Sequence, residues 1–122
     1  MSKNIVDEKA YVFAARVIKA YKYLCAKHKK VSLFNQFLRS GTAITALVHE
    51  AKFAQSKKDF INKMSIALKE ANETLCWINL LHEGEFINTV SYNSIHHDCN
   101  ELVCLLVSIV KTSKSNTDSL NS

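Results

Sequence analysis

The stretch His96-His97-Asp98-Cys99 has the densest group of side chains that could bind a metal ion. On a helix, His96 and Cys99 are one turn apart, a feasible spacing for two zinc ligands. A closed site in a helical bundle needs further ligands, and no HxxxH or ExxH pair occurs elsewhere in the chain. Cys99 also falls on the apolar stripe of its segment. We therefore predict polar helix surface here, with no metal and no cofactor.

The other carboxylates and histidines do not form a catalytic set. His49 and Glu50 are neighbours in sequence, so on a helix they point about 100° apart. Glu70 and Glu73 are one turn apart, but they lie beside Trp77 on a face that we expect to be a contact surface. A glycine-rich phosphate loop is excluded, because the chain has only two glycines. We predict no catalytic residues and a protein that is not an enzyme.

A basic face is the strongest candidate for ligand binding. The net charge is +5, and the excess of lysine and arginine is concentrated in residues 1–63. Such a surface could bind phosphate backbones through counterion release, and Tyr23 could stack on an unpaired base. It could equally be an ordinary solvated helix face. The candidate residues for binding RNA or DNA are Lys9, Arg16, Lys19, Tyr23, Lys27 and Lys30.

The elements that must position these residues are helices. The chain has no proline, two glycines and 48% hydrophobic residues, which favours long helices and a filled core. Apolar residues recur every three or four positions in residues 7–29, 33–54, 57–82 and 91–112. Short connections make successive helices antiparallel. The sequence predicts an all-α, up-down-up-down four-helix bundle over residues 1–112 and a disordered polar tail over residues 113–122.

The spacing also predicts which residues form the core and the helix ends. In the first segment the inward residues are Ala10, Ala14, Val17, Ile18, Tyr21, Leu24 and Cys25. In the second they are Phe34, Phe37, Gly41, Ile44, Val48 and Ala51. Ser32 and Ser56 are candidate N-caps, with Asp59 completing a capping box after Ser56. Gly84 is expected to be a left-handed C-terminal cap.

The cellular compartment is predicted from absent signals and from cysteine usage. There is no signal-peptide pattern and no apolar run of about twenty residues, so we expect a cytoplasmic protein without a membrane partner. In that compartment Cys25, Cys76, Cys99 and Cys104 stay reduced.

A second set of residues lies off the core stripes of the second and third segments. Scattered surface hydrophobics are common, but residues in stripes indicate a contact surface. We predict a homo-oligomer. The interface candidates are Arg39, Ala43, Ala46, Glu50, Ile66, Glu73, Trp77 and Leu80. Arg39 and Glu50 are about 16 Å apart along one helix, so each needs a partner from another helix or subunit.

Several ordered pieces of the chain resemble a known family. They include LRSGT at 38–42, Glu50-Ala51, SKKDF at 56–60, SIALKEA at 65–71 and SIVKT at 108–112. They resemble the bacterial four-helix-bundle family named for proteins encoded in intervening sequences of large-subunit ribosomal RNA genes. The resemblance implies a left-handed bundle that assembles into rings, typically pentamers, with a mostly unassigned role. This chain has Leu47 where relatives have asparagine, so any function that needs the asparagine is in doubt.

A more distant resemblance suggests an alternative role. Accessory proteins of diversity-generating retroelements form basic pentamers that bind nucleic acid and a reverse transcriptase. The sequence thus predicts a non-enzymatic oligomer that serves as a scaffold or binds another protein. The alternative is a basic ring that binds RNA or DNA through the outer face of its first helix.

Overall fold

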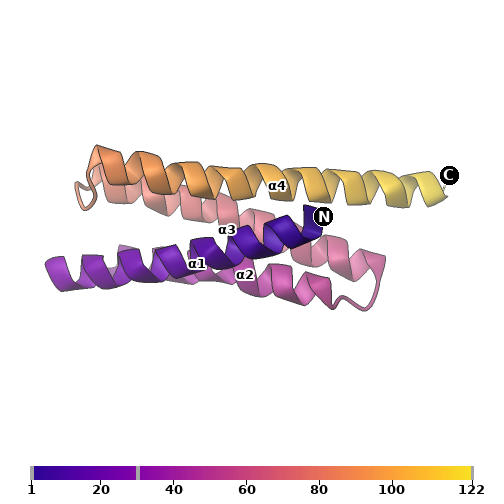
Figure 1. Ribbon diagram of the computed structural model, residues 1–122, viewed down its shortest axis with the longest axis horizontal. Helices are drawn as coiled ribbons and strands as arrows, with labels where there is room; N and C mark the ends of the chain where they lie inside the picture. The colour runs from indigo at the N-terminus through magenta and orange to yellow at the C-terminus, as the bar shows by residue number, and fades with distance from the viewer. Residues whose placement is uncertain (1, 30, 122) are drawn as a thin grey trace.

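The computed structural model describes residues 2–29 and 31–121, so the candidate Lys30 lies outside the described residues. Over this range the chain forms four helices, α1 (Ser2–Lys27), α2 (Ser32–Lys52), α3 (Lys57–Glu83) and α4 (Thr89–Asn121). Each short connection reverses the chain, so consecutive helices run antiparallel (Figure 1). The predicted all-α, up-down-up-down four-helix bundle is confirmed.

The four seams between neighbouring helices are not equivalent. Helix α2 packs closely against both α1 and α3, and α3 packs closely against α4. Helices α1 and α4 approach each other less closely than the other neighbouring pairs. We call the seams of α2 with α1 and α3 the closed side, and the seam between α1 and α4 the open side.

The core on the closed side follows the predicted spacing. All six inward residues predicted for α2 are buried, and Ser40 is buried beside them. A β-carbon added to Gly41 would lie 2.8 Å from Cγ2 of Val17, which is itself fully buried in α1. Gly41 therefore permits a close approach of α1 and α2. Next to it, the hydroxyls of Ser40 and Thr74 form a buried hydrogen bond of 2.9 Å between α2 and α3.

The buried face of α1 is rotated from the predicted one. Val6 and Phe13 join the core, although neither was among the predicted inward residues. Ile18 was predicted to be inward, and this is wrong, because its side chain is 44% exposed. The buried arc of α1 is centred on Val6, Phe13 and Val17, which leaves Ile18 at its outer margin.

Helix α4 is longer than predicted. We expected it to end near Thr112, but it continues to Asn121 and extends beyond the α2–α3 connection (Figure 1). No glycine or proline interrupts residues 113–121, and Ser113 is buried one turn after Val110. The division into a bundle and a disordered tail stays a prediction.

The N-terminal caps of α2 and α3 differ from each other. The Ser56 hydroxyl accepts a 3.0 Å hydrogen bond from the backbone N–H of Asp59, as predicted. The Asp59 carboxylate in turn accepts from the backbone N–H of Gln55 at 3.3 Å. In α2 the N-cap is Val31, whose side chain cannot accept, and the predicted Ser32 is already the first helical residue.

The turn after α3 is a Schellman motif centred one residue later than predicted. Gly84 has φ −78°, so its expected left-handed conformation is wrong. Glu85 is left-handed instead, with φ 65°. The backbone N–H groups of Glu85 and Phe86 donate to the carbonyls of His82 and Leu81, which gives the two bonds of this motif. The turn points Phe86 back toward the bundle, 5.1 Å from the Phe34 ring centroid.

Candidate functional site

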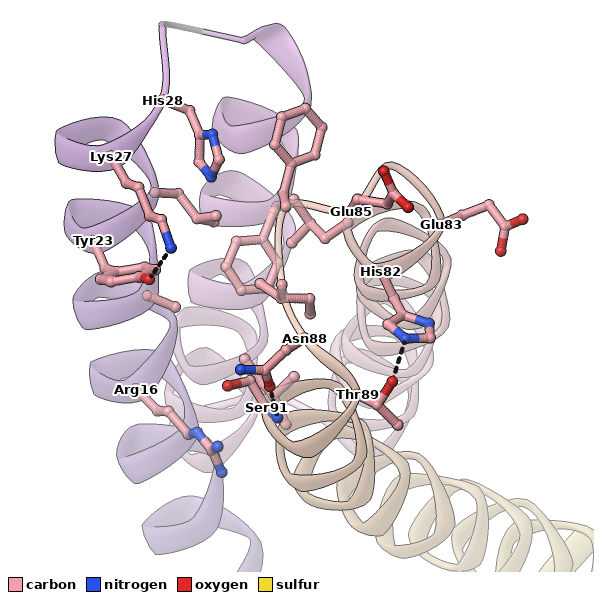
Figure 2. Close-up of a pocket in the computed structure, with 17 residues that line it drawn as sticks. Arg16, Tyr23, Lys27, His28, His82, Glu83, Glu85, Asn88, Thr89 and Ser91 are labelled. Atoms are coloured by element: carbon pink, nitrogen blue, oxygen red, sulfur yellow. Dashed lines mark hydrogen bonds between the residues drawn. The ribbon is translucent and has the colours of Figure 1, made fainter.

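A cavity of about 870 Å³ opens on the open side, between α1, the end of α3 and the start of α4 (Figure 2). Its size and position follow from the wide α1–α4 seam and from the turn that carries Phe86. Ligand-binding pockets have volumes of roughly 300–1,000 Å³ and are mostly apolar with a few polar groups. The cavity falls within this size range, but most of the residues that line it are polar. It was not predicted from the sequence, because its walls come from segments far apart in the chain.

The floor of the cavity is apolar and rigid. Leu24, Phe37 and Leu81 line it from the core, and each is almost fully buried. Phe86 packs edge-on against Phe34 and against His28, with ring centroids 5.1 Å apart in both pairs. Edge-to-face packing of this kind fixes the rings in place.

The α1 wall contains three of the six residues proposed to bind nucleic acid, Arg16, Tyr23 and Lys27. The Lys27 ammonium donates a 2.9 Å hydrogen bond to the Tyr23 hydroxyl and lies 5.4 Å from the centre of that ring. In Figure 2 the Lys27 nitrogen points down toward Tyr23 along the wall of the cavity. Tyr23 is 55% exposed.

The opposite wall is polar and belongs to the α3–α4 turn. His82 Nε2 lies 3.2 Å from Thr89 Oγ1, and the His82 ring stacks on Tyr92 at 4.3 Å with an interplanar angle of 18°. Asn88 caps α4 by accepting a 2.8 Å hydrogen bond from the Ser91 backbone. The Glu83 carboxylate points away from the cavity (Figure 2). The polar side chains of this wall contact one another, and they do not converge on a position that a reacting atom could occupy.

Two polar atoms are buried without a hydrogen-bond partner in the part of the chain that the structure describes: Nε2 of His28 and Nε1 of Trp77. His28 lines the cavity beside Phe86. Burying an unpaired polar atom is unfavourable, so such an atom calls for an explanation. In the cavity wall, Nε2 of His28 is a hydrogen-bonding group for which the protein supplies no partner.

The rest of the basic face is divided by the structure. Lys9 pairs with Glu101 at 3.0 Å, and Arg16 pairs with Asp98 at 2.6 Å. Arg16 also donates to the hydroxyl of Ser94 at 2.8 Å. These bonds join α1 to α4 across the open side, so two of the candidate cations are neutralised within the chain. Lys19 instead faces solvent.

The predicted interface residues lie on the seam of α2 and α3. Arg39 binds Glu73 at 2.7 Å and Glu70 at 3.3 Å, whereas Glu50 lies 3.7 Å from Lys63. Both charged interface candidates of α2, Arg39 and Glu50, therefore have partners on α3. The hydrogen bond from Arg39 lowers the pKa of Glu73, whereas burial raises the pKa of Glu70. The pKa of Arg39 is raised, chiefly by its bond to Glu73.

The apolar members of this surface differ in exposure. Trp77 and Ile66, predicted to lie off the core stripe of α3, are half-buried, and Trp77 packs against the core. Leu80 is 44% exposed, and Ala46 is more open to solvent than Ala43. We call the eight predicted residues the α2–α3 face: Arg39, Ala43, Ala46, Glu50, Ile66, Glu73, Trp77 and Leu80.

A larger exposed apolar surface lies on α1. Its four residues are exposed by 43% to 70% and lie on one half of the helix, where Glu8, Lys19 and Lys22 are also exposed. We call them the outer α1 face: Ile5, Tyr11, Val12 and Ile18. This face was not predicted from the sequence, because the spacing assigned Ile18 to the core.

The stretch with possible metal ligands is divided between the core and a flank of α4. Cys99 is fully buried, its thiol donates to the carbonyl of Ala71 at 3.4 Å, and burial raises its pKa to about 12. His96 lies on the flank, 5.3 Å from Tyr92 between ring centroids. Among the described residues no group of three His, Cys, Asp or Glu side chains is placed to hold a metal ion. The four cysteines are free thiols.

Within the described chain, no helix is both long enough and apolar enough to cross a bilayer.

Comparison with known proteins agrees with the fold. No curated protein matches the sequence. The crystal structure of a protein of unknown function from the S23 ribosomal protein family of Bacteroides thetaiotaomicron is similar, with a TM-score of 0.89 and 48% sequence identity. The match covers 91% of this chain and 99% of that one. Residues 2–108 match the family described as 23S rRNA-intervening sequence protein, and the chain belongs to this family.

Proposed function

We propose that the protein is a cytoplasmic, non-enzymatic homo-oligomer that serves as a scaffold or interaction module. The outer α1 face carries this proposal. Tyr11 and Val12 are 70% and 66% exposed, and Ile5 and Ile18 extend the same surface along the helix. Several well-exposed apolar side chains on one helix of a small protein are typical of a contact, because burying them removes apolar area from water.

A ring is the assembly that the two surfaces favour. A ring needs two different faces that fit each other, whereas a two-fold dimer uses one face twice. The α2–α3 face is a suitable partner for the outer α1 face, because its alanines allow close approach. Its Arg39 and Glu73 already form an ion pair, so a neighbouring subunit that covers them would bury no unpaired charge. The family resemblance favours five subunits.

The test is sedimentation equilibrium on variants that block one face each. Tyr11→Glu with Ile18→Glu blocks the outer α1 face, and Leu80→Glu blocks the α2–α3 face. Each variant alone should be monomeric, and their mixture should form dimers, because one intact interface remains. Val90→Glu is the control, since Val90 is 79% exposed outside both faces. A monomeric wild type, or variants that keep the wild-type assembly, would contradict the proposal.

The alternative function, binding of RNA or DNA, rests on a smaller set of residues than predicted. Lys19, Tyr23 and Lys27 are exposed, and Lys27 lies over the Tyr23 ring, an arrangement that suits stacking beside a phosphate. The 260/280 nm absorbance ratio before and after a high-salt wash would detect bound nucleic acid. Affinity that does not fall with salt concentration would contradict electrostatic binding.

A further inference from the structure

The cavity on the open side has the chemistry of a small-molecule pocket. The half-buried side chains of Phe86 and Ile87 form the accessible apolar floor, which lies over the buried Leu24, Phe37 and Leu81. A volume of about 870 Å³ exceeds that of one amino-acid side chain and accommodates an organic molecule with a chain or ring. The apolar part of an occupant would therefore rest on this floor.

The charged groups around the cavity differ in whether they are free to contact a ligand. Lys27 lies along the α1 wall and donates to Tyr23, and an ammonium has two further N–H donors. Arg16 lines the same wall but is engaged by Asp98 and Ser94. The opposite rim has two exposed carboxylates, Glu83 and Glu85, and that of Glu83 points outward (Figure 2). Electrostatic complementarity thus favours an occupant with one negative charge near Lys27.

The unpaired Nε2 of His28 is a second polar group in the cavity wall. It is buried there, and the aromatic rings of Phe34 and Phe86 pack against the imidazole. Because the atom is covered, the imidazole senses an occupant through its surroundings and does not bond it directly. The lysine and the imidazole lie on α1 and just after it, one residue apart in sequence.

We propose that the cavity binds a small organic anion with an apolar chain or ring, a carboxylate by preference. The anionic head lies against Lys27, and the apolar body covers Phe86 and Ile87. This site is separate from the outer α1 face and from the α2–α3 face, so it exists whether or not the protein assembles.

Decanoate and its neutral analogue decanol are suitable probes. Both are titrated by displacement of anilinonaphthalene sulfonate, and the ¹⁵N chemical shift of His28 Nε2 reports whether the probe reaches the cavity. We expect decanoate to bind at least about fivefold more tightly than decanol and to shift the His28 signal. No displacement up to millimolar decanoate, or displacement without a His28 shift, overturns the proposal.

Two pairs of variants locate the site. Lys27→Gln should weaken decanoate about five- to tenfold and change decanol less than about twofold, because one charge pair is lost. Lys19→Gln, on the same helix outside the cavity, should change neither. Ala20→Phe fills the cavity wall and should abolish both, whereas Ala26→Phe on the outer surface should not.

The controls separate binding from folding. Circular dichroism and thermal unfolding establish that each variant is folded, and Lys27→Gln replaces an exposed side chain that the fold does not need. Equal effects of Lys27→Gln and Lys19→Gln, or binding that survives Ala20→Phe in a folded protein, overturn the assignment.

Discussion

The closed and open sides of the bundle both have ion pairs between neighbouring helices, but only the open side has a cavity beside them. On the closed side, Arg39 binds two carboxylates of α3, and the hydroxyls of Ser40 and Thr74 form a buried hydrogen bond nearby. Gly41 allows α1 and α2 to pack closely. On the open side, Lys9 and Arg16 bind carboxylates across a wide seam that ends in a cavity. Charged pairs therefore do not mark a functional site in this protein. What distinguishes the open side is the space that packing leaves unfilled.

Gly41→Ala should produce the largest loss of stability, because it tests the contact that defines the closed side. The new methyl group would meet the two Cγ atoms of Val17 at 2.8 and 2.9 Å. Val17 is fully buried and branched at Cβ, so it cannot turn away without displacing its neighbours. We expect a loss of about 2 kcal/mol in urea unfolding, despite a gain in helix propensity of about 1 kcal/mol.

The double variant Gly41→Ala with Val17→Ala makes this prediction specific. It should cost less than the sum of the single changes, because the smaller residue 17 removes the overlap. Additive losses would show that α1 and α2 do not meet at Gly41.

Thr74→Val should have the second-largest effect. It removes one partner of the buried hydrogen bond with Ser40 and leaves a hydroxyl in the core. We expect a loss of about 1–2 kcal/mol by denaturant unfolding. Adding Ser40→Ala should restore part of it, because the remaining Ser40 hydroxyl keeps only a long 3.5 Å hydrogen bond to the Phe37 carbonyl. A double variant less stable than Thr74→Val would contradict this account.

The contrast between the two sides explains which core residues could be predicted from the sequence and why the cavity could not. The α2 stripe was predicted completely, because its apolar residues keep a regular spacing on a helix packed on both flanks. On α1 apolar residues occur on both faces, so spacing alone could not choose between Phe13 and Ile18. The cavity depends on the turn at Glu85, where a non-glycine residue is left-handed, and no sequence rule assigns that conformation to glutamate beside a glycine.

The predicted site residues show the same limit. The charges of Arg39 and Glu50 were recognised as needing partners, but the partners on α3 depend on how the helices are rotated. Lys9 and Arg16 belong to a basic stripe in the sequence, yet Glu101 and Asp98 lie about 80–90 residues later and neutralise them. Long-range pairing of this kind is fixed by the fold and is not encoded in local spacing.

Glu73→Gln tests the charge cluster of the closed side through its pH dependence. Arg39 lowers the pKa of Glu73 in the folded protein, so the ion pair stabilises the fold above the unfolded pKa of a glutamate. This contribution is lost as pH falls through the lowered pKa. Glu70 has a raised pKa, so its contribution has the opposite sign and is lost as pH rises through that value.

We therefore expect Glu73→Gln to cost at most about 1 kcal/mol at pH 7, because the pair is partly exposed, and to cost progressively less as pH falls through the lowered pKa of Glu73. Unfolding in urea at several pH values measures this. Glu70→Gln is the matched control, and its effect should change with pH in the opposite sense. A loss for Glu73→Gln that is equally large in acid would exclude the ion pair as its cause.

Arg16→Gln should have the smallest effect, and it tests whether the open side is held by charge alone. Arg16 and Asp98 form a short pair whose side chains are 36% and 42% exposed, so water and salt screen their attraction. We expect a loss of about 0.5 kcal/mol at low salt that largely disappears in 1 M NaCl, measured by urea unfolding at both ionic strengths. The loss caused by Gly41→Ala should not depend on salt, because it arises from steric overlap. If Arg16→Gln instead costs as much as Gly41→Ala at every salt concentration, the α1–α4 seam is as tightly coupled to folding as the closed side.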